Sequence, residues 1–81
     1  MDEKEIFEKL KKIILQELED VTEDMITMDA SFLEDLNASS IELFDLILAI
    51  EDEFEIEVPD EDAMEINTIG EAVEYLKKRI H

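Results

Sequence analysis

Residues 39–54 read SSIELFDLILAIEDEF, and this stretch decides the fold. Ser39 and Glu42 have the spacing of a capping box, in which a serine and a glutamate three residues later bind each other's backbone N–H groups. Ser39 is therefore expected to cap a helix that runs to Phe54, with Ser40 as its first residue. Because successive residues of a helix are turned by about 100°, one face collects the apolar side chains expected in the core. These are Leu43, Leu46, Ile47, Ile50 and Phe54.

The opposite face of this helix mixes large apolar side chains with acids. It carries Ile41, Phe44, Asp45, Leu48 and Asp52, with Glu51 beside them. A contiguous apolar set on a helix surface is typical of a binding site, and we interpret this face as one. The alternative is that the chain preceding the helix covers it, so that the helix is buried on two sides.

Three further segments predict an all-α fold. Apolar spacing predicts a first helix from about Lys4 to Glu19, and a last helix that begins at Thr68, where Thr68 and Glu71 form a second capping box. Pro59 and the acids after it predict a short helix, with Ala63, Met64 and Ile66 covering the core. The expected architecture is a small bundle of three main helices plus one short helix, in a single domain over residues 1–81, without a strand.

Residues 20–39 form a long connection between the first two main helices. A connection of this length is unusual in a small domain unless it is functional or pinned to the core. We expect Phe32, Leu33 and Leu36 to pin it, with a short extra turn around Glu23–Ile26. Gly70, early in the last helix, weakens that helix and has no explanation in the sequence.

The charge is strongly acidic and unevenly spread. Twenty-five acidic residues against seven basic ones give a net charge of −18, and residues 13–76 contain no lysine or arginine. Such a field repels nucleic acid and anionic membranes and attracts basic protein patches. High net charge also favours disorder, but an apolar content of 46% with clean periodicity argues for a fold. The longest apolar run, Leu46–Ile50, is too short to span a bilayer, and a monomeric cytoplasmic protein is expected.

Catalytic chemistry is scarce in this chain. The only histidine is His81, the last residue, and there is no cysteine, so Ser–His and Cys–His sites within the chain are excluded. The only glycine, Gly70, lacks the acidic run of a calcium loop before it, and we expect no dedicated metal site. Ser40 remains, beside the mixed face and at a helix N-terminus that suits a phosphate. From position alone, an ordinary serine near a cap is the better interpretation.

Residues 30–76 resemble bacterial acyl carrier proteins almost from end to end, and the first helix fits as well. The family pattern is similar to D-L-G-A-D-S-L, then an acidic helix ending E-E-F, then I-P-D. Here the corresponding residues are Asp35–Ile41, Phe54 and Val58–Asp60. The resemblance aligns Ser40 with the serine that receives 4′-phosphopantetheine.

The sequence departs from the family pattern at three positions. Asn37 replaces the glycine, Ser39 the aspartate before the modified serine, and Ile41 the leucine after it. Asn37 tolerates left-handed backbone angles, so the turn is expected to survive. Ser39 keeps a cap but removes a negative charge that family members present to their transferase. The departures point to a specialised carrier more than to loss of the modification.

The resemblance implies a non-catalytic carrier for fatty acid biosynthesis or a related pathway. A phosphopantetheinyl transferase would attach the arm to Ser40 from coenzyme A, and the thiol of the arm would hold acyl groups as thioesters. That transferase and fatty acid synthase enzymes with basic patches would be the partners. The partner face would comprise Ile41, Glu42, Phe44, Asp45, Leu48, Glu51 and Asp52. Side chains expected to open around the acyl chain are Phe7, Phe32, Leu46, Ile50, Ile66 and Tyr75.

Three alternatives stay open. The first is a carrier specialised for polyketide or aminoacyl transfer. The second is an acidic interaction module that uses the same helix face without any modification. The third is an acidic metal buffer, which predicts tight stoichiometric binding of calcium.

Overall fold

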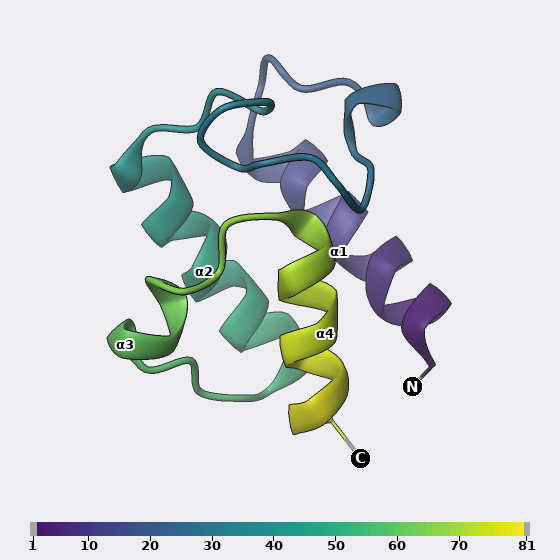
Figure 1. Cartoon of the computed structure of the whole chain (residues 1–81), viewed down its shortest axis with the longest axis vertical. Coiled ribbons are helices and arrows are strands. Elements are labelled where there is room, and N and C mark those ends of the chain that lie inside the picture. The colour runs from purple at the N-terminus through teal and green to yellow at the C-terminus, as the bar shows by residue number, and fades with distance from the viewer. Residues whose placement is uncertain (1, 81) are drawn as a thin grey trace.

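The computed structural model describes residues 2–80, and within them the chain forms four α-helices and one 3₁₀ turn (Figure 1). The elements are α1 (Glu3–Glu17), η1 (Glu23–Met25), α2 (Ser40–Phe54), α3 (Asp60–Ala63) and α4 (Ile69–Arg79). The predicted all-α bundle of three main helices and one short helix is confirmed. Over these residues the only extended pairing is an isolated bridge between Ser31 and Thr68. His81 lies outside the described residues.

The helices α2 and α4 begin directly after the capping residues that the sequence predicts. The Ser39 and Thr68 side chains cap α2 and α4, and each forms the reciprocal capping box with the glutamate three residues later. Helix α1 ends two residues earlier than its predicted end at Glu19. Leu18 turns to an extended conformation there, which buries its side chain in the core while the chain leaves the helix.

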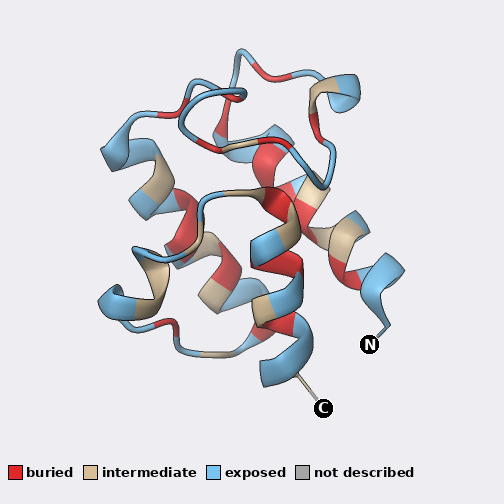
Figure 2. Cartoon of the chain, viewed as in Figure 1, coloured by how far each residue is buried: buried red, intermediate tan, exposed pale blue. Residues whose placement is uncertain are grey.

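The core lies where α1 packs against α2 and α4. Figure 2 shows the buried positions of these helices turned toward one another, with exposed positions outside. The largest fully buried side chains are Phe32, Ile6, Leu10, Ile14, Leu46, Ile69, Leu76 and Val73. Leu43, predicted as core, is only half buried, because it borders the open groove between α2 and α3.

The connection between α1 and α2 is fastened to the start of α4 by backbone hydrogen bonds. The Phe32 N–H donates to the Asn67 carbonyl at 3.0 Å, and the Ile69 N–H donates to the Ala30 carbonyl at 3.0 Å. Phe32 and Leu36 are buried, as predicted. Leu33, predicted as a third pin, is instead 47% exposed, because the turn that follows Ser31 directs it outward.

Gly70 is explained by this docking. Its N–H donates to the Met28 carbonyl oxygen at 2.8 Å, and a Cβ atom at position 70 would lie 2.8 Å from the same oxygen. Glycine is therefore the residue that lets the connection approach the backbone of α4 this closely.

The two ends of the described chain lie at one end of the molecule, and the first turn of α2 lies at the other (Figure 1). Within residues 2–80, none of the helices combines the length and the apolar composition that crossing a bilayer requires.

Candidate functional site

The turn that leads into α2 is locked by local hydrogen bonds. Asn37 adopts a left-handed conformation with φ of 56°, as predicted for the residue in the place of glycine. The Ala38 N–H donates to the Phe32 carbonyl at 2.9 Å, and an Asp35 carboxylate oxygen accepts from the Ser31 N–H at 2.7 Å. These bonds fix the position from which α2 starts.

The two adjacent serines have different environments. Ser39 Oγ accepts a hydrogen bond from the Glu42 N–H at 3.2 Å, and the Glu42 carboxylate accepts from the Ser39 N–H at 3.0 Å. Ser40 is exposed in the first turn, and no hydrogen bond in the described part of the chain involves its hydroxyl. The Ser39 hydroxyl is thus occupied by the cap, while the Ser40 hydroxyl is accessible.

A surface groove of about 220 Å³ starts at Ser40 and runs between α2 and α3. Besides Ser40 its lining comprises Leu43, Phe44, Ile47, Asp60, Ala63 and Met64. A helix N-terminus favours a negatively charged phosphate, and the mainly apolar groove suits a slender, flexible chain attached to it. These residues therefore fit a phosphate-linked arm on Ser40.

An apolar cavity of about 20 Å³ lies behind the groove. Its lining is Phe32, Leu43, Leu46, Ile47, Ile50, Val58, Ile66, Ala72, Tyr75 and Leu76. Leu43 and Ile47 line the cavity and the groove, so they are the wall between them. The cavity has space for about one water molecule, so a longer ligand would have to push its walls apart.

Phe7 is not part of this cavity, although the sequence analysis grouped it with the side chains that open around an acyl chain. It is half buried on α1, where the Lys11 Nζ lies 5.5 Å from the centroid of its ring. The other five residues of that group line the cavity.

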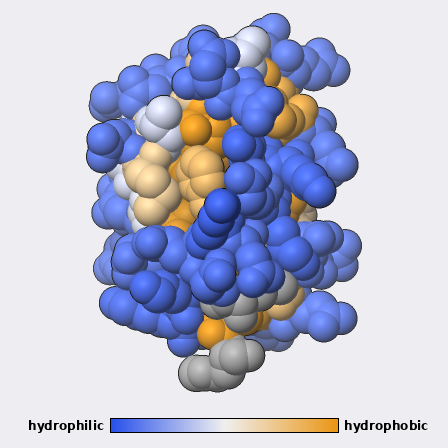
Figure 3. Space-filling view, turned by 90° about the vertical axis from the view of Figure 1, so that its right-hand side faces the viewer, coloured by the Kyte–Doolittle hydropathy of each residue, from blue (hydrophilic) through white to orange (hydrophobic). Residues whose placement is uncertain are grey.

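The outer face of α2 is exposed over its apolar residues. Ile41, Phe44 and Leu48 are 75%, 54% and 51% exposed, and Asp45 and Asp52 between them are exposed as well. The predicted alternative, burial of this face under the connection, is therefore wrong. Figure 3 shows the side of the molecule turned away from α2, where hydrophilic residues cover most of the surface and hydrophobic ones gather in its upper part.

Met64 extends the exposed apolar surface onto α3. Its side chain is 82% exposed, although the sequence predicted that it covers the core. Ala63 and Ile66 are half buried, whereas Met64, the C-cap of α3, is exposed although it lines the groove.

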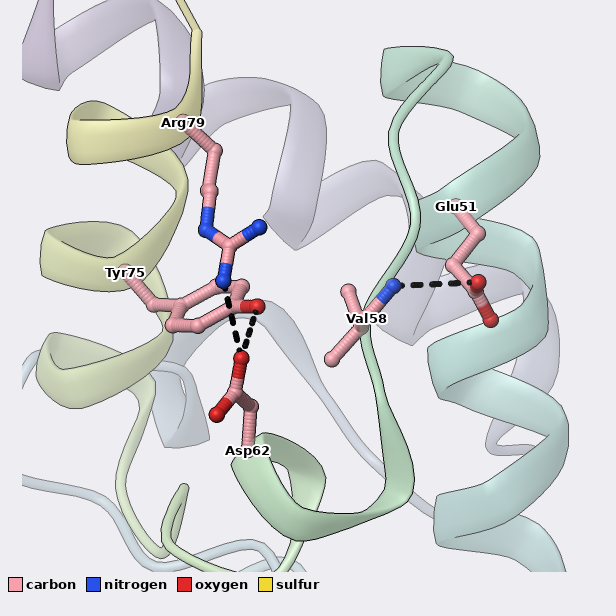
Figure 4. A network of polar contacts seen from close by, with 5 residues as sticks. All are labelled: Glu51, Val58, Asp62, Tyr75 and Arg79. Atoms are coloured by element: carbon pink, nitrogen blue, oxygen red, sulfur yellow. Dashed lines mark hydrogen bonds and ion pairs between the residues drawn. The ribbon is translucent and has the colours of Figure 1, made fainter.

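Two of the predicted partner-face acids are engaged within the fold. The Glu42 carboxylate belongs to the α2 capping box, although the residue is exposed. Glu51 is half buried, and its carboxylate accepts a hydrogen bond from the Val58 N–H at 3.1 Å (Figure 4). Glu51 therefore holds the segment after α2, and its place on the partner face stays a prediction.

A polar cluster joins α3 to α4. The Tyr75 hydroxyl donates to Asp62 Oδ2 at 2.6 Å, and Arg79 Nη2 lies 2.9 Å from the same oxygen (Figure 4). The Arg79 guanidinium also lies 4.9 Å from the centroid of the Tyr75 ring. Burial, followed by the hydrogen bond to Asp62, raises the pKa of Tyr75 to about 12. This cluster could not be predicted from the sequence, because no local pattern links residues 13 and 17 positions apart.

Acidic residues are abundant but do not converge. Within residues 2–80, no three His, Cys, Asp or Glu side chains are arranged so that they could hold a metal ion.

Comparisons with known proteins agree with this geometry. The family described as "Phosphopantetheine attachment site" matches residues 8–76. Acyl carrier proteins from the SM101 and ATCC 13124 strains of Clostridium perfringens are each 49% identical over 71 residues, covering 88% of this chain and 92% of theirs. A solved structure of an acyl carrier protein from Enterococcus faecalis superimposes with a TM-score of 0.79 at 40% identity, covering 96% of this chain and 98% of that one.

Proposed function

Because the chain belongs to the acyl carrier protein family, whose prosthetic group is 4′-phosphopantetheine, we propose that Ser40 is its attachment residue. The family consists of carriers and not of catalysts. The observation that supports Ser40 is the exposed hydroxyl on the first residue of α2, beside a neighbour whose own hydroxyl is taken by the cap. In the attachment, Ser40 Oγ forms a bond to the phosphorus next to pantetheine in coenzyme A. The bond to the adenosine bisphosphate part breaks, and the hydroxyl proton leaves to a base of the transferase.

Intact mass spectrometry tests the attachment. Incubation with coenzyme A and a promiscuous phosphopantetheinyl transferase should add one phosphopantetheine to the protein and none to Ser40→Ala. Ser39→Ala is the matched control, since it removes the adjacent hydroxyl and should still be modified. A wild-type protein that stays unmodified, or a Ser40→Ala variant that gains the group, would overturn the assignment.

We propose further that the carried group is a hydrocarbon acyl chain, as in fatty acid biosynthesis. When bound, the arm supplies a thiol that holds the acyl group as a thioester, which this cysteine-free chain cannot do itself. The cavity behind the groove has apolar walls, which favour methylene groups over the hydroxyl and keto groups of a polyketide or the charge of an aminoacyl group. Each methylene that moves from water into such a cavity gains about 0.8 kcal/mol.

Thermal unfolding of matched loaded forms tests this preference. Protein loaded with an octanoyl group should melt at a higher temperature than the same protein carrying only the arm. An aminoacyl group should give no such increase. A larger increase with the aminoacyl group would favour the alternative carrier class.

The outer face of α2 is the proposed surface for the transferase and for synthase enzymes with basic patches. Ile41, Phe44 and Leu48 supply apolar contact area, and Asp45 and Asp52 supply charge around it. Charges at the rim of an interface mainly accelerate association and make it sensitive to salt. Apolar side chains near its centre mainly slow dissociation.

Surface plasmon resonance with a phosphopantetheinyl transferase separates these contributions. Asp45→Asn should lower the association rate and weaken its salt dependence, whereas Phe44→Ala should raise the dissociation rate. Glu65→Gln, an exposed acid outside this face, is the control and should change neither rate. Equal effects of Asp45→Asn and Glu65→Gln, with no effect of Phe44→Ala, would mean that binding depends on net charge alone and not on this face.

A further inference from the structure

The apolar cavity is bounded by two different walls. Leu43 and Ile47 separate it from the groove that starts at Ser40. Ile66 and Tyr75 line the cavity and also a second, open groove of about 520 Å³ between α3 and α4. A chain that entered from Ser40 past the first wall would therefore advance toward the second.

The Tyr75 wall is held from outside. Its ring lines the cavity, while its hydroxyl donates to Asp62 Oδ2 at 2.6 Å, on the side of the second groove (Figure 4). Arg79 binds the same carboxylate oxygen at 2.9 Å and lies against the ring. The ring is thus fixed by a contact on α3 and by another on its own helix. Ile66, the other wall residue, has no comparable polar anchor.

The space beyond this wall is unsuitable for hydrocarbon. Five carboxylates line the second groove, together with Lys78, and the groove is open to water. A methylene group gains free energy by leaving water for an apolar cavity, and it gains nothing by reaching a hydrated acidic surface. The benefit of lengthening a buried chain must therefore end at the Tyr75 ring.

We propose that Tyr75, held in place by Asp62, determines the length of acyl chain that the protein buries. This inference rests on the proposed function, because it concerns the chain carried on Ser40. Chains that fit in front of the ring are buried completely, and longer chains either leave their last carbons in water or displace the ring and break its bond to Asp62. Tyr75 is then a specificity-determining residue, and Asp62 is a positioning residue that acts through it.

Urea unfolding of proteins loaded with a series of saturated acyl chains, from butanoyl upward, tests the proposal. An acyl chain that is buried only in the folded state stabilises that state. The equilibrium constant of unfolding should therefore fall about fourfold for each methylene that the cavity accepts. In the wild type the fall should stop at one chain length. In Asp62→Ala, where the ring is free to move, it should continue to longer chains.

Glu61→Ala is the matched control. Glu61 is exposed in the same first turn of α3, so its removal changes the net charge equally without touching the Tyr75 hydroxyl. In this variant the fall in the unfolding equilibrium constant should end at the same chain length as in the wild type. Tyr75→Phe keeps the ring but loses the hydrogen bond, so it should resemble Asp62→Ala and serves if Asp62→Ala folds poorly.

The outcomes separate this inference from the function on which it rests. Asp62→Ala and Tyr75→Phe could instead raise the equilibrium constant of unfolding by the same factor at every chain length, with its fall ending at the same chain length as in the wild type. The cluster would then be merely structural, and the proposal would be overturned. If mass spectrometry shows that Ser40 cannot be loaded at all, the proposed attachment fails, and the inference fails with it.

Discussion

Replacing Gly70 by alanine should destabilise the protein, although the same change stabilises most helices. In an ordinary helix, alanine is favoured over glycine by about 1 kcal/mol. Here the added Cβ would lie 2.8 Å from the Met28 carbonyl oxygen, well inside contact distance. This oxygen belongs to the backbone and accepts the Gly70 N–H, so it cannot rotate away as the end of a side chain would.

The size of the effect follows from two losses and one gain. Forcing the connection away from α4 has the cost of overpacking, about 1–3 kcal/mol. Weakening the hydrogen bond to Met28 adds about 0.5–1.5 kcal/mol. The helix preference of alanine returns at most about 1 kcal/mol. The net expectation is a free energy of unfolding lowered by about 0.5–3.5 kcal/mol.

Urea unfolding followed by far-ultraviolet circular dichroism measures this change. In a domain of this size, a loss of 1 kcal/mol lowers the melting temperature by about 4–8 °C. Glu74→Ala is the control, because it places alanine at an exposed position of the same helix and should change stability by less than about 0.5 kcal/mol. A Gly70→Ala variant that is as stable as the wild type, or more stable, would refute the close approach of residue 28 to α4.

Four further outcomes are expected. Ser39→Ala removes the side chain that accepts from the Glu42 N–H, so it should lower the free energy of unfolding by about 1 kcal/mol in a urea titration. Glu55→Gly should raise it by up to about 1 kcal/mol, because residue 55 ends α2 with a φ of 54°, which glycine adopts without strain. The pKa of Tyr75 is raised to about 12, above its value in the unfolded chain, so its contribution to stability is complete below about pH 10 and is lost as the pH rises through 12. The wild type should therefore lose stability in this range relative to Tyr75→Phe. The absorbance of Tyr75, the only tyrosine in the sequence, should report the pKa directly. Because the net charge is −18, added salt should raise the melting temperature, and a flat response in calorimetry would mean that repulsion between carboxylates contributes little.

Local patterns were sufficient to predict the helices and the start of α2. The capping boxes at Ser39 and Thr68 each involve residues three positions apart, and the structure contains both. The different environments of Ser39 and Ser40 follow from an equally short spacing, whereas the left-handed angle of Asn37 was expected from the glycine that it replaces in the family pattern. The assignment of the prosthetic group to Ser40 came from the family resemblance and stays a prediction.

Where the sequence alone failed, the decisive partner is distant in the chain or the helix is too short to have a clear face. The sequence predicted Glu51 as a surface acid, but in the fold its carboxylate accepts a hydrogen bond from the Val58 N–H. Gly70 had no explanation until Met28 was placed beside it, and Tyr75 gained its role from Asp62. Spacing along one helix sets which side chains share a face, and the sequence therefore determines the helices and their caps, while the family resemblance supplies the candidate attachment residue. Only the packing of α3 and of the connection against α4 decides which side chains bound the cavity, because those contacts join segments whose separation no local pattern encodes.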